Sequence, residues 1–195
     1  HSNTETEKID RFFRRIMQFT GPLMAKGLED TAYYTYNPFI AHNEVGDSPD
    51  YFGFDTADFH RRMQHRAEHS PLTMNTTSTH DTKRGEDTRA RLNVLSDLPG
   101  EWKKAAGEWR KMNRELKTVH ESGPVPSPSD EYLIYQALCG HLPTDGHPDE
   151  SFRSRLKEYL LKALREGKEN SSWSEPDTAY EEGIMEFTDR ILDPG

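Results

Sequence analysis

The stretch SDEYLIYQALC, residues 129–139, decides the fold class of this chain. Its first residues, Ser129, Asp130 and Glu131, are typical of a helix N-terminus, where side-chain oxygens accept hydrogen bonds from free backbone N–H groups. The rest of the stretch would be apolar on nearly every face of a helix. Because such a helix is buried on all sides, we expect it to be the most buried element of the fold.

Helical patterns extend outward from this stretch in both directions. Apolar residues recur at helical spacing in six further segments, at about residues 4–20, 55–69, 88–98, 100–116, 149–166 and 177–192. Gly21-Pro22 should end the first of these helices, and Gly27 should bend the segment that follows. Residues 37–54 should form a wrapping loop with one helical turn, and residues 122–128 a linker or long turn. The sequence therefore predicts a mainly α-helical fold.

Residues 71–79, PLTMNTTST, are the single convincing strand in the sequence pattern. The segment is rich in Thr and alternates in part between apolar and polar residues. One strand cannot form a sheet by itself. Either its partners lie outside this sequence, or the segment is an extended connection.

The composition indicates a folded piece with a large polar surface. Hydrophobic residues make up 32% of the sequence and charged residues 30%, yet 3 Trp, 8 Tyr and 9 Phe argue against disorder. Such a surface is typical of a fragment whose natural neighbours are absent. We expect one compact unit made of three segments, residues 1–70, 71–98 and 99–195.

Charge and cysteine content exclude several classes of function. The net charge of -9 repels nucleic-acid phosphates, so we expect no nucleic-acid partner. No apolar run is long enough to span a membrane, and we see no signal peptide. The single Cys139 excludes internal disulfides and favours a reducing cytoplasm as the location.

The sequence shows no cofactor motif. His65 and His69 lie four residues apart and could share a metal ion, but no third ligand lies nearby in the sequence. We interpret these histidines as part of a solvated helix face. We therefore expect neither a metal nor a cofactor.

A candidate site for chemistry follows the predicted strand. The segment TTSTHDTKRGEDTRAR, residues 76–91, places His80 and Asp81 where the strand ends and a helix follows. Barrels of α/β type carry catalytic residues at such strand ends. An ionised aspartate can bind sugar hydroxyls as the ring distorts towards an oxocarbenium ion, and a histidine can hold a second hydroxyl. Lys83 and Arg84 would keep Asp81 ionised.

The same segment has a purely structural interpretation. Asp81 or Thr82 can cap the following helix by accepting its free N–H groups. Glu86 and Asp87 would then favour the first turn through the helix dipole. A His-Asp dipeptide alone does not separate this role from a catalytic one.

Charged side chains also interrupt the apolar segment LMAKGLEDTAYY, residues 23–34. On spacing alone, Lys26 and Asp30 form a solvated ion pair one helical turn apart. The alternative is that Lys26, Glu29 and Asp30 point into a pocket and bind a substrate.

Four segments together resemble the maltooligosyltrehalose synthases, a family of α-amylase-type enzymes. The matching segments are STHDTKRGEDTRAR (78–91), GPLMAKGLEDTAYY (21–34), NEVG (43–46) and DEYLIYQ (130–136). These motifs are long and specific, and their order and spacing span nearly the whole chain. Gly85, where many members are expected to have Ser, is a departure of little consequence.

The resemblance implies a reaction and roles for individual residues. The family's (β/α)8 barrel uses an aspartate nucleophile, a glutamate general acid/base and a third aspartate that stabilises the transition state. It converts the reducing-end α-1,4 bond of a maltooligosaccharide into the α,α-1,1 bond of trehalose. The role of the third aspartate carries over to Asp81, with His80 beside it. The implied substrate-binding residues are Lys26, Lys83, Arg84, Glu29 and Asp30.

We do not find motifs for the nucleophile or the general acid/base in this sequence. The resemblance therefore implies a helical fragment of a (β/α)8-barrel enzyme, with one short strand that carries the His-Asp motif. Its partners would be a maltooligosaccharide and the remainder of its own barrel, and the fragment alone should be inactive. Two alternatives are an α-glucan hydrolase of the same family and a non-catalytic helical interaction module.

Overall fold

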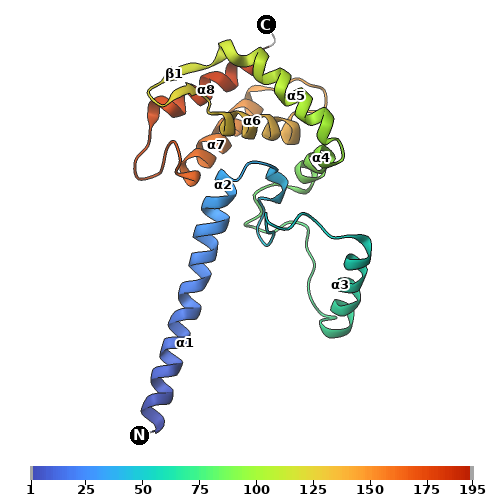
Figure 1. Ribbon diagram of the computed structural model, residues 1–195, viewed down its shortest axis with the longest axis vertical. Coiled ribbons are helices and arrows are strands. Elements are labelled where there is room, and N and C mark those ends of the chain that lie inside the picture. Colours follow the sequence, from blue (N-terminus) through green and yellow to red (C-terminus); the bar gives the residue numbers. More distant parts are fainter. Residues whose placement is uncertain (1, 194–195) are drawn as a thin grey trace.

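The computed structural model describes residues 2–193, and their side chains from Thr4 onward. It is built almost wholly from helices (Figure 1). The elements are α1 (Ser2–Met24), the π-helix η1 (Ala25–Ala32), α2 (Tyr33–Thr35), the 3-10 turn η2 (Ile40–His42), α3 (Thr56–His69), α4 (Glu86–Asp97), α5 (Pro99–Met112), the 3-10 turn η3 (Asn113–Leu116), β1 (Thr118–His120), β2 (Gly123–Val125), α6 (Pro128–His141), α7 (Glu150–Gly167) and α8 (Thr178–Leu192). The predicted mainly α-helical fold class is confirmed.

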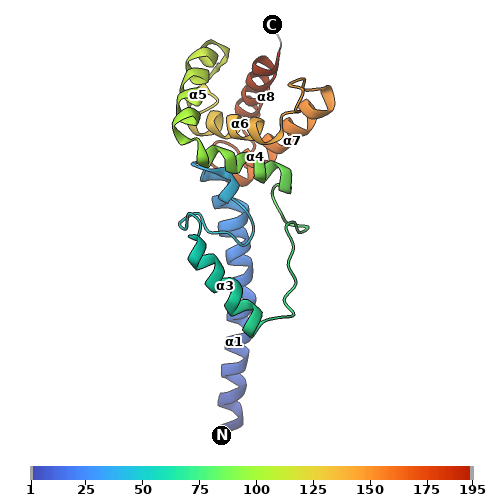
Figure 2. The ribbon, with the colours of Figure 1, turned by 90° about the vertical axis from the view of Figure 1, so that its right-hand side faces the viewer.

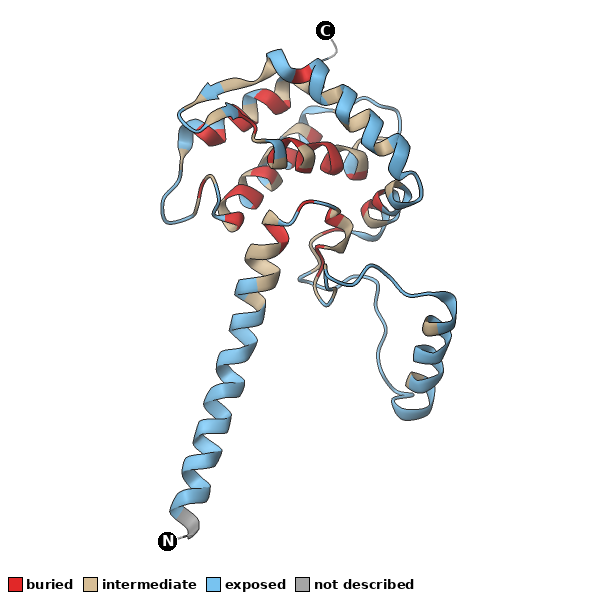
Figure 3. Ribbon diagram, in the orientation of Figure 1, coloured by how far each residue is buried: buried red, intermediate tan, exposed pale blue. Residues whose placement is uncertain are grey.

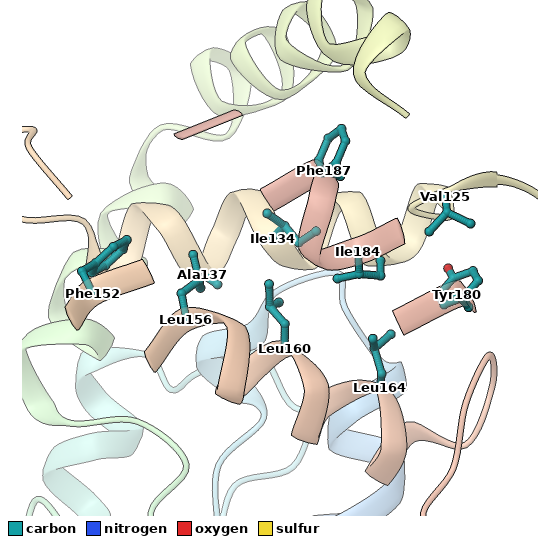
Figure 4. Packing of buried hydrophobic residues seen from close by; sticks show 10 residues of the cluster. All are labelled: Val125, Ile134, Ala137, Phe152, Leu156, Leu160, Leu164, Tyr180, Ile184 and Phe187. Atoms are coloured by element: carbon teal, nitrogen blue, oxygen red, sulfur yellow. The ribbon is translucent and has the colours of Figure 1, made fainter. Parts of the chain in front are cut away.

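Helix α6 lies at the centre of the core, as predicted. Ser127 caps it by accepting a hydrogen bond from the Asp130 N–H at 3.2 Å. Its Ile134 and Ala137 face Leu160 of α7 and Ile184 of α8 (Figure 4). Eight residues of α6 are buried, the largest number among the described helices. An apolar surface on all sides leaves this helix no stable place except between other helices.

The predicted linker or long turn at residues 122–128 contains strand β2 of a short hairpin. Strands β1 and β2 pair antiparallel, with Thr118 opposite Val125. The hairpin packs on α8, where an added Cβ on Gly183 would lie 2.6 Å from the Thr118 hydroxyl and 2.9 Å from a Val125 methyl. Strands of three residues are too short for a clear alternation pattern, so the prolines and glycine indicate a turn while the strand pairing leaves no signal.

A second apolar cluster ties the central segments of the chain to α6 and α7. It contains Ile40 of η2 and Leu92 of α4, both fully buried, with Leu133 and Ala163. Gln136 of α6 reinforces this contact, because it accepts from the Ile40 N–H at 2.9 Å and donates to a backbone carbonyl of the 37–54 loop at 2.8 Å.

Helix α1 extends away from the helices packed around α6 as a single long helix (Figures 1 and 2). The prediction that Gly21-Pro22 ends it is wrong: the helix passes through Pro22 and continues as η1. A proline removes one backbone hydrogen bond, which a helix can lose without ending. The apolar stripe of α1 is exposed, with Phe12 66% and Met17 60% accessible (Figure 3). This stripe predicts an amphipathic helix correctly but meets no partner among the described residues.

The strand predicted at residues 71–79 is not formed. These residues are irregular and wholly exposed, and Leu72 and Met74 are more than nine-tenths accessible. A strand needs a neighbour to receive its backbone hydrogen bonds, and the described part of the chain offers none at this position. The His-Asp motif therefore follows an extended connection. Within residues 2–193, no helix is both long and apolar enough to cross a membrane.

Candidate functional site

The first half of the candidate site lies on η1. Here the N–H of Tyr33 bonds to the Leu28 carbonyl, five residues back, so the helix is wider than an α-helix. The Thr31 hydroxyl also donates to the carbonyl of Lys26, at 2.9 Å. π-turns inside helices are frequent at functional sites. This one carries three of the sequence-predicted residues: Lys26, Glu29 and Asp30.

Asp30 holds two lysines that come from distant parts of the chain. It pairs with Lys26 on its own helix and accepts from the Lys83 ammonium at 3.2 Å. The hydrogen bond from Lys26 lowers the pKa of Asp30, and Lys83 acts in the same direction. The ion pair expected from the spacing is therefore formed, and it is also part of a larger polar cluster.

Lys26 and Lys83 differ in exposure. The Lys26 side chain is 77% accessible, whereas the Lys83 side chain is 9% accessible and its ammonium lies 5.2 Å from the centre of the Tyr34 ring. Lys26 is therefore free to reach a ligand with its remaining N–H groups. Lys83 is held in place by Asp30 and by the ring. Glu29 is half-buried beside them.

The second half of the site is the loop that ends in the His-Asp motif. The His80 Nε2 and an Asp81 carboxylate oxygen lie 3.0 Å apart, and both side chains are exposed. A hydrogen bond within the loop spans the motif: the Thr82 hydroxyl accepts from the Thr79 N–H at 2.6 Å. His80 and Asp81 therefore present free polar groups to solvent.

Glu44 fixes the point where this loop joins α4. Its carboxylate accepts from the N–H of Lys83 at 2.6 Å and from the N–H of Arg84 at 3.0 Å. Glu44 is 6% accessible, so these bonds lie away from water. Two backbone donors on one carboxylate fix the orientation of this turn more tightly than a single bond would.

Arg84 is buried, and its guanidinium points into the body of the protein. Its guanidinium donates to the Asn43 carbonyl at 3.2 Å and to the Tyr159 hydroxyl at 2.7 Å. The resemblance implied a substrate-binding role for Arg84. Its 5% accessibility gives it little surface to offer a ligand in this chain, and its contacts join the 43–44 segment to α7.

The two halves of the site are close enough for their charges to interact. The hydrogen bond with Asp30 raises the pKa of Lys26, and the negative charges of Glu166 and Asp81 add smaller contributions. No hydrogen bond or ion pair joins Lys26 to Asp81 in the part of the chain that the structure describes. Lys26 offers an exposed ammonium, and His80 and Asp81 offer an exposed imidazole and carboxylate; each of these groups can bind a hydroxyl.

Sequence reasoning missed the part played by Asn43 and Glu44. The NEVG segment carries part of the resemblance, but its pattern predicts no role for either residue. The usable signal was an acid placed within an otherwise wrapping loop, because an acid buried there must have partners. Tyr159 gave no signal, since it belongs to the stripe of α7. Among the described residues, no group of three or more His, Cys, Asp and Glu side chains could hold a metal ion.

The chain has relatives among known proteins. No family model matches the sequence. The chain is 37% identical over 179 residues to a putative maltooligosyl trehalose synthase of Mycobacterium tuberculosis. The aligned residues cover 92% of this chain and 22% of that protein.

Solved structures give the same result. A maltooligosyl trehalose synthase structure matches 100% of this chain with a TM-score of 0.85 at 32% identity, over 25% of its own length. The enzyme from Arthrobacter ramosus matches 93% of the chain with a TM-score of 0.77 at 36% identity, over 22% of its length. The chain thus spans about a quarter or less of the relatives that it matches. In sequence and in fold, along nearly its whole length, this chain is similar to one segment of the maltooligosyl trehalose synthases.

Proposed function

We propose that this chain supplies the transition-state aspartate and the acceptor-side lysines of an enzyme that isomerises the reducing end of maltooligosaccharides. The observation that carries the proposal is the joining of two motifs: Asp30 of η1 binds Lys83, two residues beyond Asp81. That contact brings the MAKG segment beside the His-Asp segment, which are more than fifty residues apart in sequence.

The proposed reaction has two steps and consumes no water. A carboxylate nucleophile supplied by the rest of the enzyme attacks the anomeric carbon, and the α-1,4 bond to the terminal glucose breaks as that oxygen takes a proton from the general acid. The released glucose then attacks the same carbon through its own anomeric hydroxyl, which gives its proton to the same group. The product contains an α,α-1,1 bond, and configuration is retained by two inversions.

The chain's own residues act on the sugars in this scheme. Asp81 accepts hydrogen bonds from ring hydroxyls, and these bonds strengthen as positive charge develops in the transition state. His80 holds a neighbouring hydroxyl. Lys26 holds the freed glucose while it reorients, and Asp30 keeps the ammonium of Lys26 in place. Glu29 and Lys83 line the same edge of the site, while the buried Arg84 holds the backbone beneath it in place.

The isolated chain is proposed to be inactive, because a retaining reaction needs a nucleophile and a general acid that we do not identify in it. The exposed apolar stripe of α1 supports this proposal over the self-sufficient interaction module. A chain that folds for itself would leave less of such a stripe in water. Incubating the chain with maltopentaose tests the point, and formation of any product would contradict it.

The test of the reaction uses a chimera. We would replace the matching segment of the Arthrobacter ramosus enzyme by this chain and analyse the products from maltopentaose. A non-reducing trehalosyl product is expected, and glucose or maltose alone would favour the hydrolase instead. The variant Asp81→Asn should lower kcat by about 100-fold or more. Normal turnover in that variant would contradict the assignment of Asp81.

A further inference from the structure

We infer that Glu44, with Asn43 beside it, is a positioning residue that sets the place of Asp81 relative to Lys26. The inference rests on the proposed function above and adds a residue to it. Nothing about Glu44 suggests contact with substrate, because its side chain is turned inward and 6% of the residue is accessible. Its effect on the reaction would pass through the backbone that it holds.

Glu44 holds the backbone at the end of the His-Asp loop through hydrogen bonds. One carboxylate oxygen accepts from the Lys83 N–H at 2.6 Å and the other accepts from the Arg84 N–H at 3.0 Å. The first oxygen also accepts from the Val45 N–H at 3.0 Å, which fixes the rotation of the carboxylate itself. The loop that carries Asp81 is exposed and irregular upstream, so this grip is the nearest buried anchor to Asp81.

Asn43 connects to the η1 side of the site. The Asn43 side-chain amide donates to the carbonyls of Tyr33 at 3.0 Å and Tyr36 at 2.6 Å, at the end of the helix that carries Lys26. Asn43 is fully buried. Two adjacent side chains therefore face opposite ways, one towards each half of the site.

The contacts close into a ring. From η1 the path runs through Asn43 and Glu44 to Lys83, and from the Lys83 ammonium back to Asp30 on η1 at 3.2 Å. A closed ring of hydrogen bonds holds its members more firmly than an open chain, because no single bond can relax independently of the others. The ring thus fixes the two exposed ligand-binding groups, Lys26 and Asp81, by means of buried ones.

Loss of the Glu44 carboxylate should displace the turn. In Glu44→Gln the side chain keeps its shape, but the amide group meets a backbone N–H where an oxygen stood before. At least one buried donor is left without an acceptor, and the turn must move to satisfy it. A displacement of about 1 Å at a catalytic group can lower turnover by about 100-fold.

The test compares Glu44→Gln with Glu182→Gln, which removes the same charge from an exposed position on α8. In the chimeric enzyme, Glu44→Gln should lower kcat by about 10- to 100-fold with KM changed by less than about threefold. Glu182→Gln should leave both unchanged. A merely structural role would reduce the amount of folded enzyme and leave kcat per folded molecule intact, and that outcome would overturn the inference.

A second measurement keeps the inference testable if the chimera does not fold. In the isolated chain, amide hydrogen exchange at Lys83 and Arg84 should accelerate by about tenfold or more in Glu44→Gln, as expected for a lost acceptor of roughly 1.4 kcal/mol. The amide chemical shift of Asp81 should move as well. Unchanged exchange and shifts in residues 80–84 would contradict the inference.

Asp81→Asn distinguishes a failure of the proposed function from a failure of the positioning role of Glu44. If that variant abolishes turnover while Glu44→Gln does not, the proposed function stands and the positioning role fails. If Asp81→Asn retains turnover, the proposed function fails first. If both assignments hold, the double variant should be little worse than Asp81→Asn alone, because Glu44 acts through Asp81.

Discussion

Two regions of the molecule differ in how far their apolar side chains are buried. One is the helical body formed by α4 to α8, and the other is the pair of projecting segments around α1 and α3. Both have amphipathic helices, and both contain large apolar side chains at helical spacing. On α6, α7 and α8 most of these side chains are buried against one another, whereas on α1 and α3 they are largely exposed (Figure 3). The difference shows that an apolar stripe predicts a helix reliably but predicts burial only if a partner is present.

The candidate site lies at the border between these two regions. Its buried groups are Glu44, Arg84 and Asn43, and Arg84 bonds to Tyr159 of the body. Its exposed groups are Asp81 and Lys26. Rigid support on one side and free polar groups on the other is the arrangement that a ligand site needs. The following predictions test the contrast between the regions, from the largest expected effect to the smallest.

The same substitution, Phe to Ala, should lower the stability strongly in the body and hardly at all on α1. Phe187→Ala, in the centre of the core at 0% accessibility, should lower the free energy of unfolding by about 3–5 kcal/mol through lost burial and a cavity. Phe12→Ala on α1, where the ring is exposed, should change it by less than about 0.5 kcal/mol. Urea denaturation of the isolated chain measures both. Comparable losses in the two variants would show that α1 is packed in solution.

Removing Gln136 should loosen the contact between the body and the 37–42 segment. Gln136→Ala leaves the Ile40 N–H without its acceptor in a fully buried position, which costs about 1–3 kcal/mol. Urea denaturation again gives the value. Exchange of the Ile40 amide should accelerate more than that of the α8 amides. A uniform acceleration across the chain would show that the two parts unfold together.

The ion pair between buried Glu181 and partly exposed Arg165 should make stability depend on acid pH. Arg165 donates two hydrogen bonds to Glu181, at 2.8 and 2.7 Å, and these lower the pKa of that carboxyl. A carboxyl whose pKa is lower when folded stabilises the fold above its unfolded pKa of about 4.3, and this contribution is lost as the pH falls below that value. Glu181→Gln should therefore lower Tm at pH 7, and its Tm should approach that of the parent near pH 3. A constant difference between the two across this range would contradict the role of the pair.

The ion pairs of Asp30 should matter least for stability. Asp30→Asn weakens the contacts with Lys26 and Lys83 at a partly exposed position, so Tm should fall by no more than about 3 °C. Differential scanning calorimetry measures the shift, and 0.5 M NaCl should reduce it by screening. A decrease similar to that of Gln136→Ala would place Asp30 among the structural residues of the body.

The sequence by itself determined the helices and the most buried one among them. Spacing alone located α3 to α8 to within a few residues, because a helix is held by bonds between near neighbours. It also determined which residues could carry chemistry, since an Asp beside a His or a Lys within an apolar segment is visible in one dimension. The motifs and their spacing identified the resemblance that the comparisons then showed.

Only the tertiary structure decided where the segments meet. The hairpin of β1 and β2 exists because Gly183 of α8 leaves room for it, and the predicted strand at residues 71–79 fails because no neighbour supplies its bonds. The contact of Asp30 with Lys83 and the grip of Glu44 on the His-Asp loop join residues from separate segments. Such contacts depend on the packing of the whole body, and no local pattern of residues encodes them.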